Sequence, residues 1–229
     1  RDHGTDHAME DLLAMLMDVH DGETGAGLSD TQLRNETITF LLAGHETTAN
    51  ALSWIFHLVS QHPEVEARLI EEIDTVLGGR TPVLEDVAKL TYTGAVIRET
   101  MRLYPPIWII ERRVIAEDEV GGYTLPAGSA VVISPYALHR HPAFWERPEE
   151  FDPGRFLGAA PAAYIPFGAG PRFCIGNEFA LLEAHLITAM ILQSFRPCAV
   201  PGAAVRPQPD ITLRPMNGLP MTLKPRNGL

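Results

Sequence analysis

A cysteine lies within a glycine-rich segment, FGAGPRFCIG, at residues 167–176. The thiolate of Cys174 would be a strong, soft ligand for iron. A helix predicted over residues 177–194 follows at once, and its N-terminal amides and dipole favour a negative charge on the sulfur. The glycines let backbone amides turn toward the sulfur and let the chain pass close to a flat ring. The alternative, a buried structural cysteine, is the commoner fate of a lone cysteine, but it explains neither the glycines nor Arg172.

The spacing Phe167-x-x-Gly170-x-Arg172-x-Cys174-x-Gly176 resembles the haem-binding signature of the cytochrome P450 family, and all five fixed positions are met. The resemblance implies that Cys174 is the axial ligand of the haem iron and that the whole set binds the cofactor. Phe167 would shield the sulfur from water, and Arg172 would pair with a carboxylate of the ring. A zinc site is a weak alternative, because no second cysteine lies at ligand spacing.

A second segment, AGHETT at residues 43–48, lies midway along a predicted long helix. The helix face that contains Gly44 and Thr47 is small and nearly smooth, with one hydroxyl. Taken alone, this pattern fits close packing between helices. The resemblance implies instead that the segment crosses the oxygen-binding face of the haem. Gly44 would then make room for dioxygen, while Glu46 and Thr47 would be catalytic residues that help to deliver protons to it.

Glu99 and Arg102 are three residues apart on another predicted helix, where they can pair. An ordinary solvated surface pair would be the usual interpretation. Their position before the cysteine segment resembles the Glu-x-x-Arg motif of the same family, which implies a structural role. Arg155, in FDPGRF, falls where the family has Pro-Glu-Arg-Phe and would be the third partner. Gly154 replaces the usual glutamate, so any contact of that side chain is absent.

Two further features lie outside these motifs. Arg112 falls where a propionate-binding arginine often lies in the family, although the adjacent Arg113 could take that place. His139 and His141 form a His-x-His pattern that could bind a metal, but a surface loop is the preferred interpretation.

The elements that must position these residues are mainly helical. Gly94 should weaken its helix by about 1 kcal/mol, and the helix over 177–194 is apolar on nearly every side, which predicts a buried helix. We expect a mainly α fold with a small β part, the C-terminal half of the cytochrome P450 fold, as a single partial domain over residues 1–229. The predicted helices cover residues 8–20, about 31–61, 63–77, 91–104 and 177–194; the short strands cover 107–115, 120–125, 129–134, 211–214 and 221–224.

Composition restricts the class of protein. The 229 residues are 45% hydrophobic and 21% charged, with a formal net charge of −11. This balance fits a soluble globular protein and argues against nucleic-acid binding. The two cysteines indicate no disulfide framework, no apolar run approaches the ~18 residues of a spanning helix, and no signal peptide is recognised. A cytoplasmic location is expected, with a membrane anchor upstream of Arg1 left open.

The resemblance implies a haem b monooxygenase that inserts one atom of dioxygen into a lipophilic small molecule. Its electrons would come from NAD(P)H through a ferredoxin- or flavodoxin-type donor or a flavoprotein reductase. Residues 107–112 and 216–219 would line the substrate side. One alternative is a haem-thiolate enzyme that uses peroxide or isomerises its substrate. The other is a truncated, non-catalytic chain unable to hold haem, which would show a large exposed apolar face along the long helix.

Overall fold

The computed structural model describes residues 11–226. The chain divides into two compact units, Arg1–Glu46 and Thr47–Leu229, called here the first and the second unit. Helix α2 (Asp30–Gln61) begins in the first unit and ends in the second. None of the helices within residues 11–226 is long and apolar enough to cross a membrane.

The first unit contains helix α1 (Leu12–Met17) and the start of α2. The Asp11 carboxylate caps α1 by accepting from the Ala14 amide at 2.7 Å. Helix α1 is shorter than the predicted 8–20: residues 8–10 lie outside the described part, and after Met17 the chain turns into a short bridge between His20 and Gly27. At the start of α2, the Gln32 side chain accepts from the Ser29 amide at 3.0 Å and the Ser29 hydroxyl accepts from the Gln32 amide at 3.3 Å, which makes a capping box.

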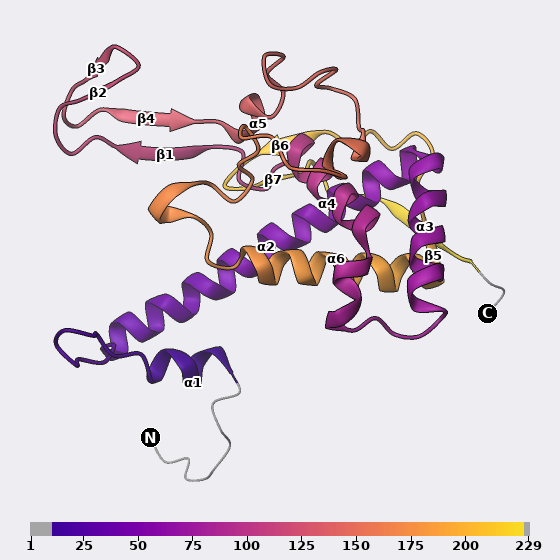
Figure 1. Ribbon diagram of the computed structural model, residues 1–229, viewed down its shortest axis with the longest axis horizontal. Coiled ribbons are helices and arrows are strands. Elements are labelled where there is room, and N and C mark those ends of the chain that lie inside the picture. Colours follow the sequence, from indigo (N-terminus) through magenta and orange to yellow (C-terminus); the bar gives the residue numbers. More distant parts are fainter. Residues whose placement is uncertain (1–10, 227–229) are drawn as a thin grey trace, which may run out of the picture. The chain divides into compact units, whose positions relative to one another are not determined.

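The second unit is built mainly on helices (Figure 1), and its buried apolar side chains form a main core and a smaller cluster around Trp145 and Phe156. Helix α3 (Pro63–Leu77), with the bounds predicted for it, ends at Gly78, whose φ of 57° is left-handed. Helices α3, α4 (Thr91–Leu103) and α6 (Asn177–Ser194) contact one another. Their shared core includes Ile55, Val59, Leu69, Ile73, Val96, Ile97 and Leu192. Shorter helical turns are η1 (Leu84–Lys89), α5 (Pro135–Leu138), η2 (Pro153–Phe156) and η3 (Gly170–Arg172).

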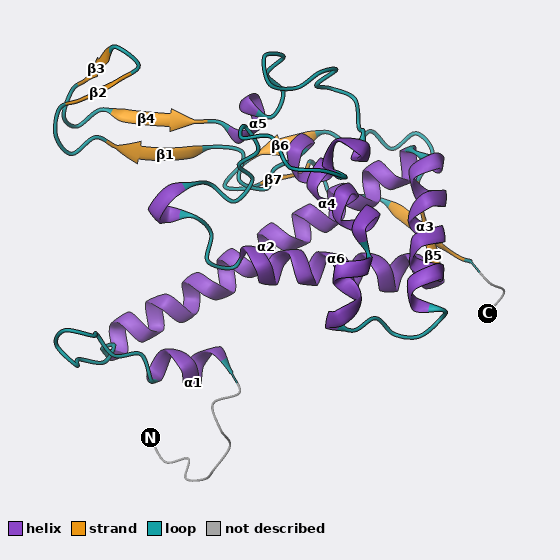
Figure 2. Ribbon diagram, in the orientation of Figure 1, coloured by secondary structure: helices purple, strands orange, loops and turns teal. Residues whose placement is uncertain are grey.

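The strands of the second unit form small antiparallel pairs (Figure 2), so the predicted mainly α class with a small β part is confirmed. The pairs are β1 (Ile110–Arg113) with β4 (Ala130–Ile133), β2 (Asp118–Val120) with β3 (Tyr123–Leu125), β5 (Phe195–Ala199) with β8 (Met221–Pro225), and β6 (Pro207–Pro209) with β7 (Leu213–Pro215).

Two predictions about strands were wrong. The single strand expected over 120–125 is a hairpin, because Gly121 and Gly122 have φ of 58° and 83° and form the two-residue turn between β2 and β3. Strands β5 and β6 were not predicted, since both contain proline. Proline is tolerated there because each strand of a two-stranded sheet has one free edge that needs no amide donor.

Helix α6 is buried on one side only, although its composition predicted burial on nearly every side. Phe179 is 71% exposed and Met190 is 49% exposed, whereas Ala189 and Leu192 are buried in the core. One face of α6 packs on α3 and α4, and the other faces solvent. Composition alone could not show this, because both faces of the helix are apolar.

Gly94 has a packing reason that the sequence did not reveal. A Cβ built on Gly94 would lie 2.9 Å from Nε2 of His185, a buried residue of α6. Glycine therefore lets α4 and α6 approach closely, and this contact offsets its low helix propensity. Burial lowers the pKa of His185, so the imidazole at this contact tends to be neutral.

The start of α4 is capped by a residue from another helix. Leu90 precedes α4 and has no polar side chain, but the carboxylate of Glu72 on α3 accepts from the amides of Tyr92 and Thr93 at 2.6 and 2.8 Å. It also accepts from the Thr93 hydroxyl at 2.8 Å. These bonds satisfy amides that the helix itself leaves free and place a negative charge at the positive end of its dipole.

The substitution Glu72→Gln should lower the free energy of unfolding by about 1–2 kcal/mol, because the neutral amide accepts these bonds less well. Urea denaturation measures the change. Glu71→Gln, at an exposed neighbouring position, is the matched control and should change stability little. Equal losses in the two variants would contradict the capping role.

Candidate functional site

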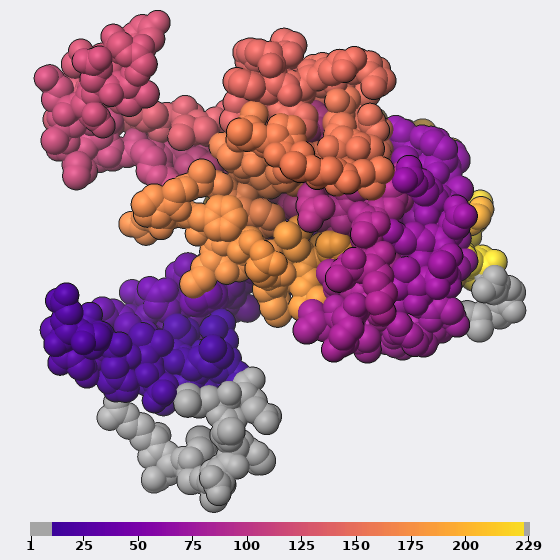
Figure 3. Space-filling view, in the orientation of Figure 1, coloured from indigo at the N-terminus to yellow at the C-terminus, as the bar shows by residue number. Residues whose placement is uncertain are grey.

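The cysteine segment forms a closed loop directly before α6. The Cys174 amide donates to the Phe167 carbonyl at 3.0 Å, and the Gly168 amide donates to the Ile165 carbonyl at 3.1 Å. Gly168 and Gly170 have φ of 75° and 71°, in the left-handed region that favours glycine. The side chain of Cys174 is exposed. The orange part of the chain in Figure 3, which includes this segment, lies on the visible surface of the second unit.

Phe167 holds the loop to the body of the second unit. Its half-buried side chain packs against the main core, and its ring meets that of Phe173 edge to face, with 6.4 Å between centroids. Strand β1 lies beside the loop, since a Cβ on Gly168 would be 3.8 Å from Cδ1 of Ile110. The loop therefore rests on both the helical core and the β1–β4 sheet.

The predicted cofactor-binding arginines are both exposed. Arg172 lies at the end of η3, two residues before the cysteine. Arg112 lies on β1 and donates to the Glu111 carbonyl at 2.9 Å. Because solvent reaches both guanidinium groups, either can turn toward an anionic group without breaking a buried ion pair.

The AGHETT segment straddles the boundary between the two units. Gly44 and Glu46 are exposed and belong to the first unit; Thr47 is half-buried and begins the second. Among residues 11–226, no atom outside the helix lies within 4 Å of a Cβ built on Gly44, so the small residue leaves its side of the α2 backbone uncovered by them. The roles assigned to the three residues remain predictions.

Glu99 and Arg102 form a buried, two-pronged ion pair on α4. Nε and Nη2 of Arg102 donate to the two carboxylate oxygens of Glu99 at 2.7 and 2.8 Å, and both side chains are 0% exposed. Nε of the third predicted partner, Arg155, lies 3.5 Å from Oε1 of Glu99, as an ion pair. Burial raises the pKa of Glu99, and the hydrogen bonds and charge of Arg102 act in the opposite direction. Glu99 and Arg102 therefore form a buried ion pair and not a solvated surface pair.

The same pair holds the irregular segment from residue 139 to 155. Arg102 donates to the carbonyls of His139, Pro148 and Glu150 at 2.8, 2.6 and 2.9 Å. The Asp152 amide donates to Glu99 at 2.9 Å. Carbonyl groups of a segment without regular structure would otherwise be costly to bury, so the ion pair takes the place of a sheet or helix here.

The expectation that His139 lies on a surface loop was wrong. Its side chain is 0% exposed and lies among the rings of Trp145 and Tyr164. Burial and the charges of Arg102 and Arg140 lower the pKa of His139 to about 4. Its neighbour His141 is exposed, as expected. No local sequence signal marked this burial, because Tyr164 and α4 reach His139 only in the folded chain.

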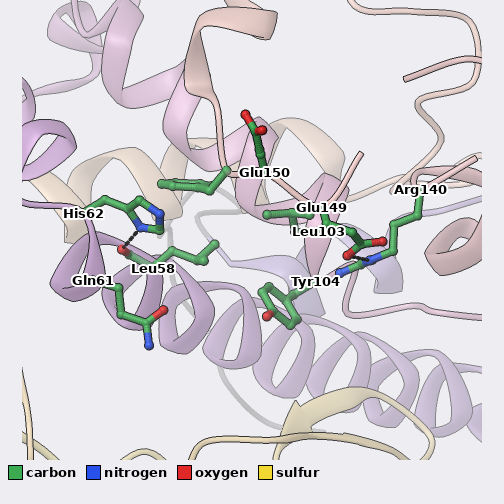
Figure 4. Close-up of a pocket in the computed structure, with 9 residues that line it drawn as sticks. Leu58, Gln61, His62, Leu103, Tyr104, Arg140, Glu149 and Glu150 are labelled. Atoms are coloured by element: carbon green, nitrogen blue, oxygen red, sulfur yellow. Dashed lines mark hydrogen bonds and ion pairs between the residues drawn. The ribbon is translucent and has the colours of Figure 1, made fainter. Parts of the chain in front are cut away.

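A separate hollow of about 440 Å³ lies between α2, the end of α4 and residues 140–151 (Figure 4). The figure shows Nε of Arg140 paired with Glu149, at 3.2 Å, and Nδ1 of His62 bonded to the Leu58 carbonyl, at 2.8 Å. The lining of this hollow includes none of the residues that the sequence predicted as functional.

The donor set around the loop fits a haem better than a bare metal ion. Across residues 11–226, no cluster of three histidine, cysteine or acidic side chains could hold a metal. A haem iron needs a single protein ligand, since the porphyrin supplies four others, and one exposed thiol before a helix N-terminus meets that need. Exposed arginines at positions 112 and 172 suit the carboxylates of the same group. The residues present therefore fit a haem held by a single thiolate.

Comparisons identify the family. The cytochrome P450 family model matches residues 2–221. Cyclooctat-9-en-7-ol 5-monooxygenase of Streptomyces melanosporofaciens is 47% identical over 99% of the chain and 50% of that protein. Pentalenene oxygenase of Streptomyces avermitilis is 43% identical over 88% of the chain and 46% of that protein. The crystal structure of the cytochrome P450DA haem domain matches with a TM-score of 0.87 and 35% identity, over 95% of this chain and 50% of that one.

The chain belongs to the cytochrome P450 family, which confirms the predicted resemblance. The family implies a haem cofactor. The chain spans about half the length of the curated relatives it matches.

The substitution Arg102→Lys should lower the free energy of unfolding by about 2–4 kcal/mol, since lysine keeps the charge but cannot supply the planar set of donors. Chemical denaturation followed by circular dichroism measures the loss. Arg147→Lys is the matched control: Arg147 pairs with Glu150 at 2.6 Å but is 57% exposed, so its loss should be about 0–1 kcal/mol. A loss at Arg102 as small as that at Arg147 would contradict the role of the buried pair.

Proposed function

We propose that this chain carries the haem-thiolate centre of a monooxygenase that acts on a lipophilic organic molecule. The carrying observation is the exposed thiol of Cys174, held by a glycine loop directly before α6. Names of the relatives, a monooxygenase and an oxygenase, support the same class of reaction. Electrons would come from NAD(P)H through a ferredoxin- or flavodoxin-type donor or a flavoprotein reductase.

In this proposal the residues of the cysteine loop hold the haem. Cys174 binds the iron, and Arg112 and Arg172 bind the haem carboxylates. Gly170 and Gly176 have no side chains, so the haem ring can approach the backbone of the loop. Phe167, packed against the core, fixes the loop and limits water near the sulfur. When bound, the haem supplies the oxygen chemistry, and its thiolate ligand favours cleavage of the O–O bond.

The AGHETT segment of α2 would deliver protons during the reaction. Gly44 leaves room for dioxygen beside the helix backbone. Glu46 and Thr47 guide protons toward the dioxygen, Thr47 through a hydroxyl that both accepts and donates hydrogen bonds.

The residues after α4 would face the substrate. Trp108 is held in place by two hydrogen bonds. Its indole N–H donates to the Asp210 carbonyl at 2.8 Å, and the Trp108 carbonyl accepts from the Ser134 hydroxyl at 3.0 Å. Ile107 and Ile110 are partly exposed, and Ile109 is exposed. Such a rigid apolar segment suits a hydrophobic ligand.

A second candidate is a chain that folds without holding haem. It is favoured by the exposed apolar side chains of α2, where Ile38, Leu41 and Leu42 are 45%, 68% and 66% exposed. Such a face needs cover from another group or chain.

One substitution separates the two candidates. The chain purified with haem, reduced and exposed to carbon monoxide, should give the red-shifted absorption band of a thiolate ligand. Cys174→Ser should abolish this band, because the serine hydroxyl is a poor ligand at neutral pH. Cys198→Ser, at the other of the two cysteines, is the matched control and should keep the band. Absence of the band in the unmodified chain would support the second candidate.

A second test concerns the proton pathway. Thr47→Ala should lower the amount of product formed per dioxygen consumed by about tenfold or more and raise peroxide release, since the hydroxyl is lost. Thr47→Ser keeps the hydroxyl and should remain close to the unmodified protein. Simultaneous measurement of oxygen uptake, peroxide and product gives the ratio. Equal behaviour of the alanine and serine variants would contradict the assignment.

A further inference from the structure

The His139 side chain connects two parts of the second unit through its two ring nitrogens. Nδ1 lies 3.2 Å from the carbonyl oxygen of Arg102, at the end of α4. Nε2 lies 2.9 Å from the amide nitrogen of Ile165, at the entry to the cysteine loop. The imidazole is 0% exposed, so water does not replace either bond.

The two partners fix the protonation state of the ring. An amide N–H can only donate, so Nε2 must accept from Ile165 and carries no proton. A carbonyl can only accept, so Nδ1 must carry the proton that is donated to Arg102. The structure therefore requires the neutral imidazole with its hydrogen on Nδ1.

From Ile165 the hydrogen bonds continue to the cysteine. The Ile165 carbonyl accepts from Gly168, and the Phe167 carbonyl accepts from Cys174, at 3.1 and 3.0 Å. Both backbone groups of Ile165 are thus hydrogen-bonded: its amide donates to His139, and its carbonyl accepts from Gly168 within the loop. Protonation would turn Nε2 from an acceptor into a donor. Nε2 and the Ile165 amide would then both be donors, and the hydrogen bond between them would be lost.

The charged and titratable groups around His139 oppose this protonation. The guanidinium of Arg102 donates to the His139 carbonyl at 2.8 Å, and Arg140 follows it in sequence; both positive charges disfavour an imidazolium. Glu99 could favour one, but its carboxylate is already paired with Arg102. Tyr164, whose ring lies 5.4 Å from that of His139, donates its hydroxyl to the Arg98 carbonyl.

We propose that His139 is a positioning residue for Cys174: its neutral ring holds the entry of the cysteine loop against α4, and proton uptake releases that entry. The claim about the loop stands on the geometry alone. Its extension to the iron ligand rests on the proposed function.

The pH window follows from the two states of the ring. In the folded chain the pKa is about 4, whereas the ordinary value is 6.5. A histidine whose pKa is lowered on folding contributes stability above its unfolded pKa, and this contribution is lost as the pH falls through the folded pKa. We therefore expect the loop entry to be fully held at pH 7 and progressively released below about pH 6.5, with most of the release near pH 4.

Two substitutions separate the two nitrogens. The side-chain oxygen of glutamine reaches the place of Nε2, so His139→Gln keeps an acceptor for the Ile165 amide. The side-chain nitrogen of asparagine reaches only the place of Nδ1, so His139→Asn keeps the donor to Arg102 and loses the loop bond. Amide hydrogen exchange in the chain without haem is the measurement.

In His139→Asn, the amides of Ile165 and Cys174 should exchange about tenfold faster or more, while the amide of Leu69 in the α3 core is unchanged. In His139→Gln all three should stay close to the unmodified chain. Faster exchange at all three amides in both variants would indicate a merely structural role and overturn the proposal. So would unchanged exchange at Ile165 in the asparagine variant.

Acidification provides the second readout. Protection of the Ile165 amide, corrected for intrinsic exchange, should fall between pH 6.5 and 4 in the unmodified chain and stay level in His139→Gln, which does not titrate. Should either variant fail to fold, nitrogen NMR of the unmodified chain decides: the His139 ring should be neutral at pH 6, with its proton on Nδ1. A charged ring at that pH would overturn the proposal.

The haem-loaded chain separates this inference from the proposed function. If both hold, acid should convert the red-shifted carbon monoxide band to the ordinary one at higher pH in His139→Asn than in His139→Gln. If the amide result is obtained but no variant shows the thiolate band, the proposed function fails and the loop contact stands. If the band is equally acid-sensitive in both variants, the extension to the iron ligand fails.

Discussion

The buried ion pair between Glu99 and Arg102 is the interaction on which the organisation of the second unit depends. Isolated charges in an apolar interior would be prohibitively costly, and here each is neutralised by the other and surrounded by hydrogen bonds. The ion pair also orders the chain around it. A segment of more than ten residues without regular structure hydrogen-bonds its backbone to the pair, as it would otherwise do within a helix or sheet. His139 extends this organisation from α4 to the loop that carries Cys174.

Much of this fold could be predicted from the sequence because its helices carry strong local signals. Pro63 and Gly78 mark the ends of α3, and Ser29 with Gln32 marks the start of α2. The spacing around Cys174 was equally informative, since five constrained positions in ten residues rarely coincide by chance.

What could not be predicted depends on contacts between distant segments. The burial of His139 is set by α4 and by residues 145 and 164, which no local pattern reveals. The close approach at Gly94 is visible only once α6 lies beside α4. The apolar sequence of α6 indicated burial but could not say which face packs on the core, and the proline-containing strands β5 and β6 depend on having a free edge.

The cap that Glu72 provides has a consequence for the order of folding. Helix α4 cannot satisfy its own first amides, because the carboxylate that accepts from them belongs to α3. A nascent α4 would fray at its beginning until the preceding helix has formed and docked. The two helices should then form and melt together as one cooperative unit, and the charged pair further along α4 would be assembled with that unit.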